Sequence, residues 1–199
     1  MNDSTGSNVA LLAIDFQKDF MCPGGFGEAL GNDPNKLHHI IEPTRKLFSF
    51  CRENNIPIIH TREIISTQKW DQIPVNHADT ERALMREDGI EIIPELQPHK
   101  DERIIDKPGK GAFYATDLEQ VLRNLSIDTL VICGVTTEIC VHSTVREAND
   151  RGFKCIVMED CTASYFPQFH AVGLQMIAAQ GNLLGTVSDS KTWMETFKM

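Results

Sequence analysis

Short apolar segments alternate with longer amphipathic segments along almost the whole chain. Apolar runs rich in β-branched residues predict strands, and the segments with helical spacing between them predict helices. The predicted strands are Val9–Ile14, Ile56–His60, Arg103–Asp106, Asp128–Cys133, Lys154–Met158 and Leu183–Val187, and the predicted helices cover residues 34–54, 117–125, 138–151 and 168–180. This alternation is typical of an α/β protein, in which helices cover both faces of a mostly parallel sheet. We therefore expect a three-layer, Rossmann-like fold with six strands in the order 3-2-1-4-5-6.

Local signals define the expected boundaries of the domain and of one helix. Thr116 is the expected N-cap of the helix at 117–125. Residues 62–100 show weak periodicity with several Pro and Gly interruptions, so we expect a long loop there. Residues 1–8 are polar and predict a disordered arm, which leaves residues 9–199 as a single domain.

The composition is ordinary for a globular protein, and the charge and apolar runs of the chain argue against nucleic acid and membranes as partners. The 199 residues are 41% hydrophobic and 24% charged, with a formal net charge of -9. An acidic chain without a basic cluster does not suit nucleic acid, whose phosphates must be neutralised. The apolar runs are far shorter than the ~20 residues that span a bilayer, and residues 1–8 lack the features of a signal peptide. We expect a cytoplasmic protein that binds neither nucleic acid nor membrane.

The sequence also argues against a metal or an organic cofactor. The spacing of His60, His77, His142 and His170 does not match that of zinc ligands. The loop at residues 107–112 has no Ser or Thr after its lysines, so it is not a nucleotide-binding P-loop. We expect neither metal nor cofactor.

One cysteine occupies a position that suits a nucleophile. The fourth predicted strand breaks at Gly134, and Cys140 follows in the first turn of the next helix. Unpaired backbone N–H groups and the helix dipole at such a position favour a thiolate. A buried structural cysteine is the alternative, because free cysteines usually behave as small hydrophobic residues. The other five cysteines fit that alternative, and none forms a CxxC pair.

Two charged residues follow other predicted strands. Asp15 comes directly after the first strand and Lys107 directly after the third. Because ligands of parallel sheets bind beyond the carboxyl ends of the strands, Asp15, Lys107 and Cys140 are expected to converge on one cleft. Asp15 is a candidate general base, and the backbone N–H groups of residues 134–137 could face a developing oxyanion. A turn aspartate, a surface lysine and a simple turn are the alternatives for these three features.

Three motifs resemble those of the isochorismatase-like cysteine hydrolases. They are Leu12-Ala-Ile-Asp15-Phe-Gln17-Lys-Asp19-Phe20, then Asp106-Lys107-Pro-Gly-Lys110-Gly-Ala-Phe113, then Gly134-Val-Thr-Thr-Glu-Ile-Cys140-Val-His-Ser-Thr144-Val-Arg146-Glu-Ala148. The resemblance covers nearly the whole chain. It implies a catalytic triad of Asp15, Lys107 and Cys140. It also implies a cis peptide between Val135 and Thr136 that would direct N–H groups at the oxyanion.

The same resemblance points to a class of substrate. The presence of Cys140 indicates the amidase branch of the family, and the segment His60-Thr-Arg-Glu-Ile-Ile-Ser lacks the metal-binding histidines of nicotinamidases. The chain is most similar to biuret and related ureide amidohydrolases, which implies that Phe20, Lys110 and Gln180 contact the substrate. The substrate would be a small amide or ureide, hydrolysed through a thioester with release of ammonia. A homo-oligomer, either dimer or tetramer, is also implied.

Several alternatives remain open on the sequence. Another activity of the same fold would act on ureidoacrylate, N-carbamoylsarcosine or nicotinamide. A second alternative is a catalytically silent binding member of the fold. A third is a thiol redox protein that uses Cys133 and Cys140, although placement on a strand and on a helix disfavours that pairing.

Overall fold

The fold is centred on a parallel sheet of six strands, in a computed structural model that describes residues 8–64 and 86–197. The strand order is β3-β2-β1-β4-β5-β6, and every pairing is parallel, which confirms the predicted order and fold class. The strands are β1 (Val9–Ile14), β2 (Ile58–Glu63), β3 (Arg103–Lys107), β4 (Thr129–Val135), β5 (Lys154–Ala163) and β6 (Thr186–Ser188). β1 and β4 are adjacent at the centre, where both faces of the sheet are covered.

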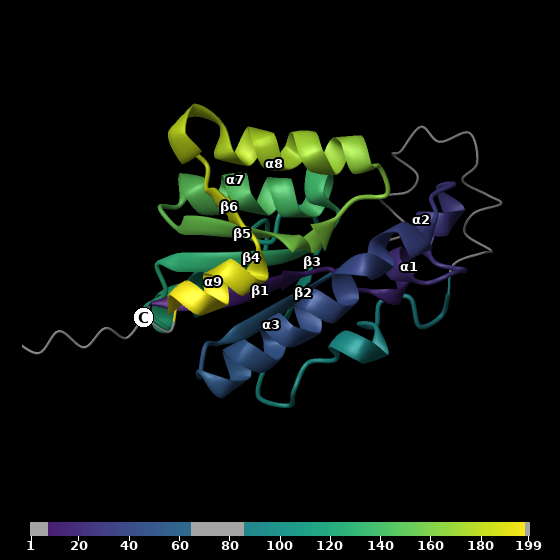
Figure 1. Ribbon diagram of the computed structural model, residues 1–199. Helices are drawn as coiled ribbons and strands as arrows, with labels where there is room; N and C mark the ends of the chain where they lie inside the picture. Colours follow the sequence, from purple (N-terminus) through teal and green to yellow (C-terminus); the bar gives the residue numbers. More distant parts are fainter. Residues whose placement is uncertain (1–7, 65–85, 198–199) are drawn as a thin grey trace, which may run out of the picture.

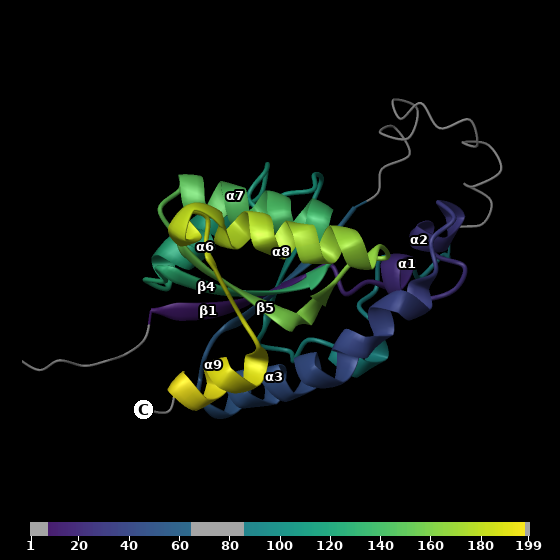
Figure 2. The ribbon, with the colours of Figure 1, turned by 45° about the horizontal axis from the view of Figure 1, so that its top comes forward.

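Helices cover the two faces of the sheet. They are α1 (Lys18–Met21), α2 (Phe26–Ala29), η1 (Pro34–Ile40), α3 (Ile41–Glu53), η3 (Pro94–Leu96), α6 (Leu118–Asn124), η4 (Thr137–Val141), α7 (His142–Asp150), α8 (Pro167–Asn182) and α9 (Ser190–Phe197). α3 and α9 pack on one face, and α7 and α8 pack on the other (Figure 1). The turned view separates the same layers, with α1 and α2 beyond one end of the sheet (Figure 2).

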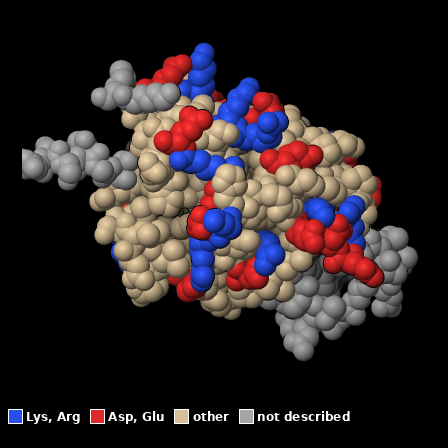
Figure 3. Space-filling view, turned by 90° about the horizontal axis from the view of Figure 1, so that it is seen from below, with Lys and Arg blue, Asp and Glu red and all other residues tan. Residues whose placement is uncertain are grey.

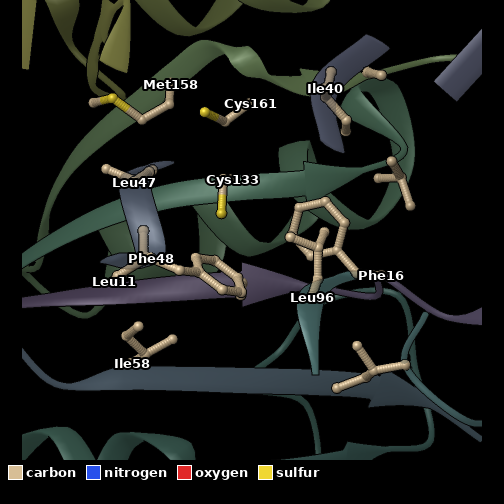
Figure 4. Close-up of a cluster of buried hydrophobic side chains, with 14 of the residues drawn as sticks. Leu11, Phe16, Ile40, Leu47, Phe48, Ile58, Leu96, Cys133, Met158 and Cys161 are labelled. Atoms are coloured by element: carbon tan, nitrogen blue, oxygen red, sulfur yellow. The ribbon is translucent and has the colours of Figure 1, made fainter. Parts of the chain in front are cut away.

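Each face has its own apolar core. On the α3 face, Phe48, Leu11 and Cys133 belong to one cluster of buried side chains (Figure 4). On the opposite face, Leu12 and Ile132 pack with residues of α6, α7 and α8. Successive residues of β1 and β4 thus alternate between the two cores, which is why these strands read as continuous apolar runs.

Element boundaries differ from the prediction in places where polar residues are buried. β2 continues to Glu63, three residues beyond its predicted end, and β5 continues to Ala163. The helix predicted over 34–54 begins instead as the 3₁₀ segment η1. The α-helix α3 then starts at Ile41, two residues before Pro43, whose ring nitrogen has no N–H. The sequence analysis missed α9, whose Trp193 is buried against α3.

The predicted cap of the helix at 117–125 is shifted by one residue. The N-cap is Asp117, whose side chain makes no capping hydrogen bond. Thr116 nevertheless contributes, because its hydroxyl oxygen accepts a hydrogen bond from the backbone N–H of Leu118 at 3.3 Å. The expected hydroxyl group therefore serves this helix from outside the cap position.

Two predicted segments fall partly or mostly outside the described residues. These are the arm at residues 1–8, of which only residue 8 is described, and the loop at 62–100, of which residues 62–64 and 86–100 are described. Residues 62 and 63 belong to β2, so the loop starts later than predicted. Within the described parts of the chain, no helix is long and apolar enough to cross a membrane. On the face seen from below, Lys and Arg side chains lie interspersed with Asp and Glu side chains (Figure 3).

Candidate active site

Four adjacent strands deliver polar residues to the same edge of the sheet. Asp15 follows β1, Glu63 ends β2, Lys107 ends β3, and the turn after β4 leads to Cys140. Asp15 has a backbone φ of 54°, which is uncommon for a residue other than glycine. Backbone of this kind is frequent at functional sites, where the surrounding structure holds it in place.

Asp15 and Lys107 form a completely buried ion pair. Lys107 Nζ lies 2.8 Å from Asp15 Oδ2, and both side chains are 0% exposed. The hydroxyl of Thr61 donates to Asp15 Oδ1 at 2.6 Å. Lys107 Nζ also donates to the backbone carbonyls of Gly109 and Lys110, at 2.9 and 3.0 Å. This ammonium therefore has a full set of acceptors away from water.

Burial and charge act against each other on these two groups. Burial raises the pKa of the Asp15 carboxyl, and this effect outweighs the opposing charge and hydrogen bond of Lys107. Burial alone would lower the pKa of Lys107, but the charges of Asp15, Cys140 and Glu63 raise it. Asp15 is therefore a stronger base than an ordinary aspartate, and Lys107 keeps its proton.

The third group is the thiol of Cys140, which is 5% exposed. Single ligand atoms of Asp15, Glu63 and Cys140 all lie within 4.8 Å of one another. Burial raises the pKa of Cys140 well above its usual range, and the charges of Asp15 and Glu63 add to this effect. The expectation that its position favours a resting thiolate is therefore wrong. The resting thiol is neutral, so it would need a base to act as a nucleophile.

The turn before Cys140 has unusual backbone geometry. Gly134 has a φ of 129°, and a Cβ atom there would lie 2.1 Å from the carbonyl oxygen of Ile14, so no side chain fits. The peptide between Val135 and Thr136 is cis, as the resemblance implied. The chain then enters η4, a single π-helical turn that carries Cys140 and continues into α7.

A small cavity of about 110 Å³ opens onto the Cys140 thiol. Its polar lining includes Glu63, Lys110 and Asn32. Its walls are largely apolar and come from short elements outside the sheet: Phe20, Phe26, Gly27, Leu30, Ile139, Tyr165 and Phe166. Phe20 and Phe26 meet edge to face, and the hydroxyl of Tyr165 donates to the Phe20 carbonyl at 2.7 Å. The cavity therefore suits a small molecule with an apolar or planar face.

Glu63 is a site residue that the sequence analysis missed. Its Oε2 lies 3.5 Å from Cys140 Sγ and 3.6 Å from Lys107 Nζ, and its Oε1 accepts a hydrogen bond from Lys110. Asp15, Glu63 and Cys140 are residue types that bind metals. The Lys107 ammonium, however, lies beside both carboxylates and already supplies positive charge there.

Residues 9–191 match the isochorismatase domain. The chain belongs to the isochorismatase family. This confirms the resemblance to isochorismatase-like cysteine hydrolases that the three motifs indicated.

Two sequence relatives and one solved structure show how far this likeness extends. The isochorismatase family protein YddQ of Bacillus subtilis is 32% identical over 156 residues, which is 78% of each chain. The ureidoacrylate amidohydrolase RutB of Acinetobacter baylyi is 25% identical and covers 96% of this chain and 84% of its own. The crystal structure of a cysteine hydrolase from Pseudomonas syringae pv. phaseolicola has a TM-score of 0.81 at 26% identity, covering 96% of this chain and 92% of that one.

In this member of the isochorismatase family, one predicted substrate contact does not reach the site. Gln180 is exposed and lies in a kink near the end of α8, with a φ of 55°. Phe166 lines the cavity at the start of α8, so Gln180 lies roughly 20 Å further along the helix at 1.5 Å per residue. Gln180 and Gly181 both have positive φ and form this kink.

In this isochorismatase-family chain, Cys140 is the cysteine that lines the cavity, beside Asp15 and Glu63. Burial raises the pKa of Cys51, Cys155 and Cys161 to about 12, and unlike Cys140 none of these three thiols lines the cavity. Cys133 packs in the core on the α3 face, whereas Cys140 packs in the core on the opposite face. A redox pair of Cys133 with Cys140 therefore has no support in the structure.

Proposed function

We propose that the protein is a cysteine-dependent amidohydrolase that cleaves a C–N bond of a small amide or ureide, such as biuret, and releases ammonia. The observation that carries this proposal is the set of groups around Cys140. A buried neutral thiol lies beside two carboxylates, and one of these is held by a fully buried ammonium. A thiol in such a setting can be activated by a neighbouring base and can form a covalent intermediate.

The acylation step uses the triad of Asp15, Lys107 and Cys140. Asp15 takes the thiol proton, and the sulfur attacks the carbonyl carbon of the substrate. The raised pKa of Asp15 suits this role, because a stronger base draws the proton more effectively. The C–N bond then breaks, and Asp15 returns the proton to the departing nitrogen, which leaves as ammonia. Lys107 holds Asp15 in position through the 2.8 Å ion pair.

The turn before Cys140 supports the charge that develops on oxygen. The Val135–Thr136 cis peptide and the start of η4 bring the backbone around Thr136 to the wall of the cavity. In the proposed reaction, the N–H groups of Thr136 and Cys140 stabilise the tetrahedral oxyanion. Water then attacks the thioester, Asp15 takes a proton from that water, and the proton passes to the departing sulfur.

The lining of the cavity supports a small, planar substrate. The volume of about 110 Å³ leaves room for few heavy atoms, and Phe20 offers an aromatic wall. Lys110 can donate to a carbonyl at the far end of the substrate. Biuret combines this size and planarity with two carbonyl groups, one on each side of its central nitrogen.

Ureidoacrylate is the second candidate substrate. The likeness to RutB, an amidohydrolase of ureidoacrylate, extends over 96% of this chain. Lys110 is 49% exposed, so its ammonium could bind the carboxylate that this substrate carries. N-carbamoylsarcosine and nicotinamide complete the set of substrates to be compared. A catalytically silent binding member of the fold would form no acyl adduct with any of them.

Intact-protein mass spectrometry after mixing with each amide tests the proposal directly. We expect a transient acyl adduct on Cys140 and release of ammonia with the best substrate. Cys140→Ser should lose turnover, whereas Cys22→Ser, a thiol outside the cavity lining, should retain both adduct and turnover. Ammonia release at the wild-type rate by Cys140→Ser would disprove the cysteine mechanism.

We also propose that the enzyme is a cytoplasmic homo-oligomer. All six cysteines are free thiols in the structure, in keeping with a reducing compartment. One face of α8 exposes Phe169, Val172 and Met176, each between 47% and 51% exposed, and a second copy of the chain could bury this face. Light scattering should give a dimer or larger, and Val172→Asp should shift it towards monomer. A monomeric wild type would refute the assembly.

A further inference from the structure

The site holds a second carboxylate that the proposed mechanism does not use. Glu63 is the last residue of β2 and is 6% exposed. In the resting site, the Cys140 thiol donates to Glu63 Oε2 at 3.5 Å, and Lys110 donates to Glu63 Oε1. Both carboxylate oxygens thus have partners, and one of these partners is the nucleophile itself.

A buried side chain fixes the position of Glu63. Gln17, which is 0% exposed, donates through Nε2 to the Glu63 carbonyl at 3.0 Å. The Glu63 N–H in turn donates to Gln17 Oε1 at 2.6 Å. This pair of bonds ties the end of β2 to the loop that follows Asp15. The Glu63 carboxylate is therefore held in place beside the thiol, as selective recognition of a ligand requires.

In the proposed reaction, Cys140 loses the thiol proton that it donates to Glu63. When Asp15 takes this proton, Glu63 Oε2 loses its hydrogen-bond donor and lies beside a sulfur that carries negative charge. Lys107 Nζ stays 3.6 Å away as a charge, but its N–H groups already face Asp15 and the carbonyls of Gly109 and Lys110. A buried acceptor left unpaired costs free energy, so the site gains from a substrate that supplies a donor at this point. The oxygen lies 3.5 Å from the attacking sulfur, so this donor must sit close to the carbon under attack.

We propose that the Glu63 carboxylate accepts a hydrogen bond from an N–H group of the substrate. This N–H group is attached to the scissile carbonyl on the side that stays bound after ammonia leaves, so the enzyme selects ureides over simple carboxamides. This inference rests on the proposed amidohydrolase function. In a ureide, the atom next to the scissile carbonyl on the retained side is an N–H nitrogen. In a simple carboxamide, it is a carbon without a donor. Lys110, bound to the other oxygen of Glu63, can donate to the next carbonyl of the substrate.

Biuret and malonamide provide a matched pair of probes, because they differ only in the central group, N–H in biuret and CH₂ in malonamide. We expect wild-type kcat/KM to favour biuret by on the order of 100-fold or more, since sites built to pair a polar group reject analogues without it. Glu63→Met removes the acceptor at similar side-chain length and should reduce this ratio to within about tenfold. Glu53→Gln removes a carboxylate at the exposed end of α3 and should leave the ratio unchanged.

The possible outcomes separate the inference from the function on which it rests. Malonamide hydrolysed as fast as biuret, through an acyl adduct on Cys140, would overturn the selectivity while the function stands. Loss of all acylation with every amide would overturn both. A Glu63→Met enzyme with the wild-type ratio would also overturn the role of Glu63. If that variant does not fold, biuret methylated on its central nitrogen gives the answer with the wild type. Unchanged kcat/KM for the methylated compound refutes the inference, and a loss of about 100-fold supports it.

Discussion

Replacement of Lys107 by methionine tests the buried ion pair most directly. The substitution keeps an unbranched side chain but removes an ammonium that lies 2.8 Å from Asp15 and 3.6 Å from Glu63. At an effective dielectric constant of about 20, the closer contact alone is worth about 6 kcal/mol before desolvation is subtracted. Removing one partner of a buried pair usually costs about 3–5 kcal/mol, because the other charge is left uncompensated.

The stability that Lys107→Met loses should depend on pH, with a larger loss at higher pH. Burial already raises the pKa of Asp15 above its usual 3.8, and removing Lys107 raises it further. A carboxyl with a raised folded-state pKa reduces stability only above its unfolded pKa, near 4, and reduces it more as the pH rises towards the folded value. The deficit of Lys107→Met relative to wild type should therefore be smaller at pH 5 than at pH 8. Activity should be lost at both values.

Urea unfolding of wild type, Lys107→Met and Lys110→Met at the two pH values measures this effect. Lys110 is the matched control, because it lies in the same loop and pairs with Glu63 but is 49% exposed. An exposed pair of this kind contributes about 0–1 kcal/mol. Equal losses for the two lysine variants, or a Lys107→Met deficit that does not change with pH, would refute the reasoning.

Three further predictions concern the framework of the site. Hydrogen bonds from His60, Arg52 and a backbone N–H outweigh burial and lower the pKa of Glu102 to about 2. Calorimetry of Glu102→Gln should thus show about 3 kcal/mol lost at pH 7. The gap from wild type should close as the pH falls from about 5 to 2, and a constant gap would contradict this account. Gly134→Ala should lose most of its kcat/KM and have a lower Tm, because the added Cβ would lie 2.1 Å from the carbonyl oxygen of Ile14. Wild-type values of both quantities would show that the turn can accommodate the methyl group. Trp193→Ala should cost about 3–5 kcal/mol in urea unfolding, and a loss below 1 kcal/mol would mean that α9 packs loosely.

The sequence was sufficient to predict the sheet because its strands are buried on both faces. β1 and β4 alternate between two apolar cores, so their residues form apolar runs that stand out from the helices. The positions of Asp15, Lys107 and Cys140 follow from the rule that ligands bind at the carboxyl ends of parallel strands. The structure brings all three together, as the order of the strands required.

Glu63 could not be predicted, because its burial depends on partners far away in sequence. The segment His60-Thr-Arg-Glu63 is polar, so the pattern predicts that the strand ends at His60, yet most of these side chains are buried in β2. Glu102 pairs with His60, Asp15 accepts from Thr61, and Gln17 binds the backbone of Glu63. A polar strand end that is buried by such contacts has no local pattern. The one available signal was its position, since Glu63 comes three residues after the predicted end of the second strand.

The cavity is assembled from two sources that can change independently. The reacting groups stand on the strand ends of the sheet or directly after them, whereas most of its apolar wall comes from the segments around α1 and α2 and from the start of α8. Substitutions at Phe20, Phe26 or Phe166 would reshape the space offered to a substrate without disturbing the central strands. A protein engineer who wished to accept a larger amide would therefore diversify this wall first and leave the strand ends untouched.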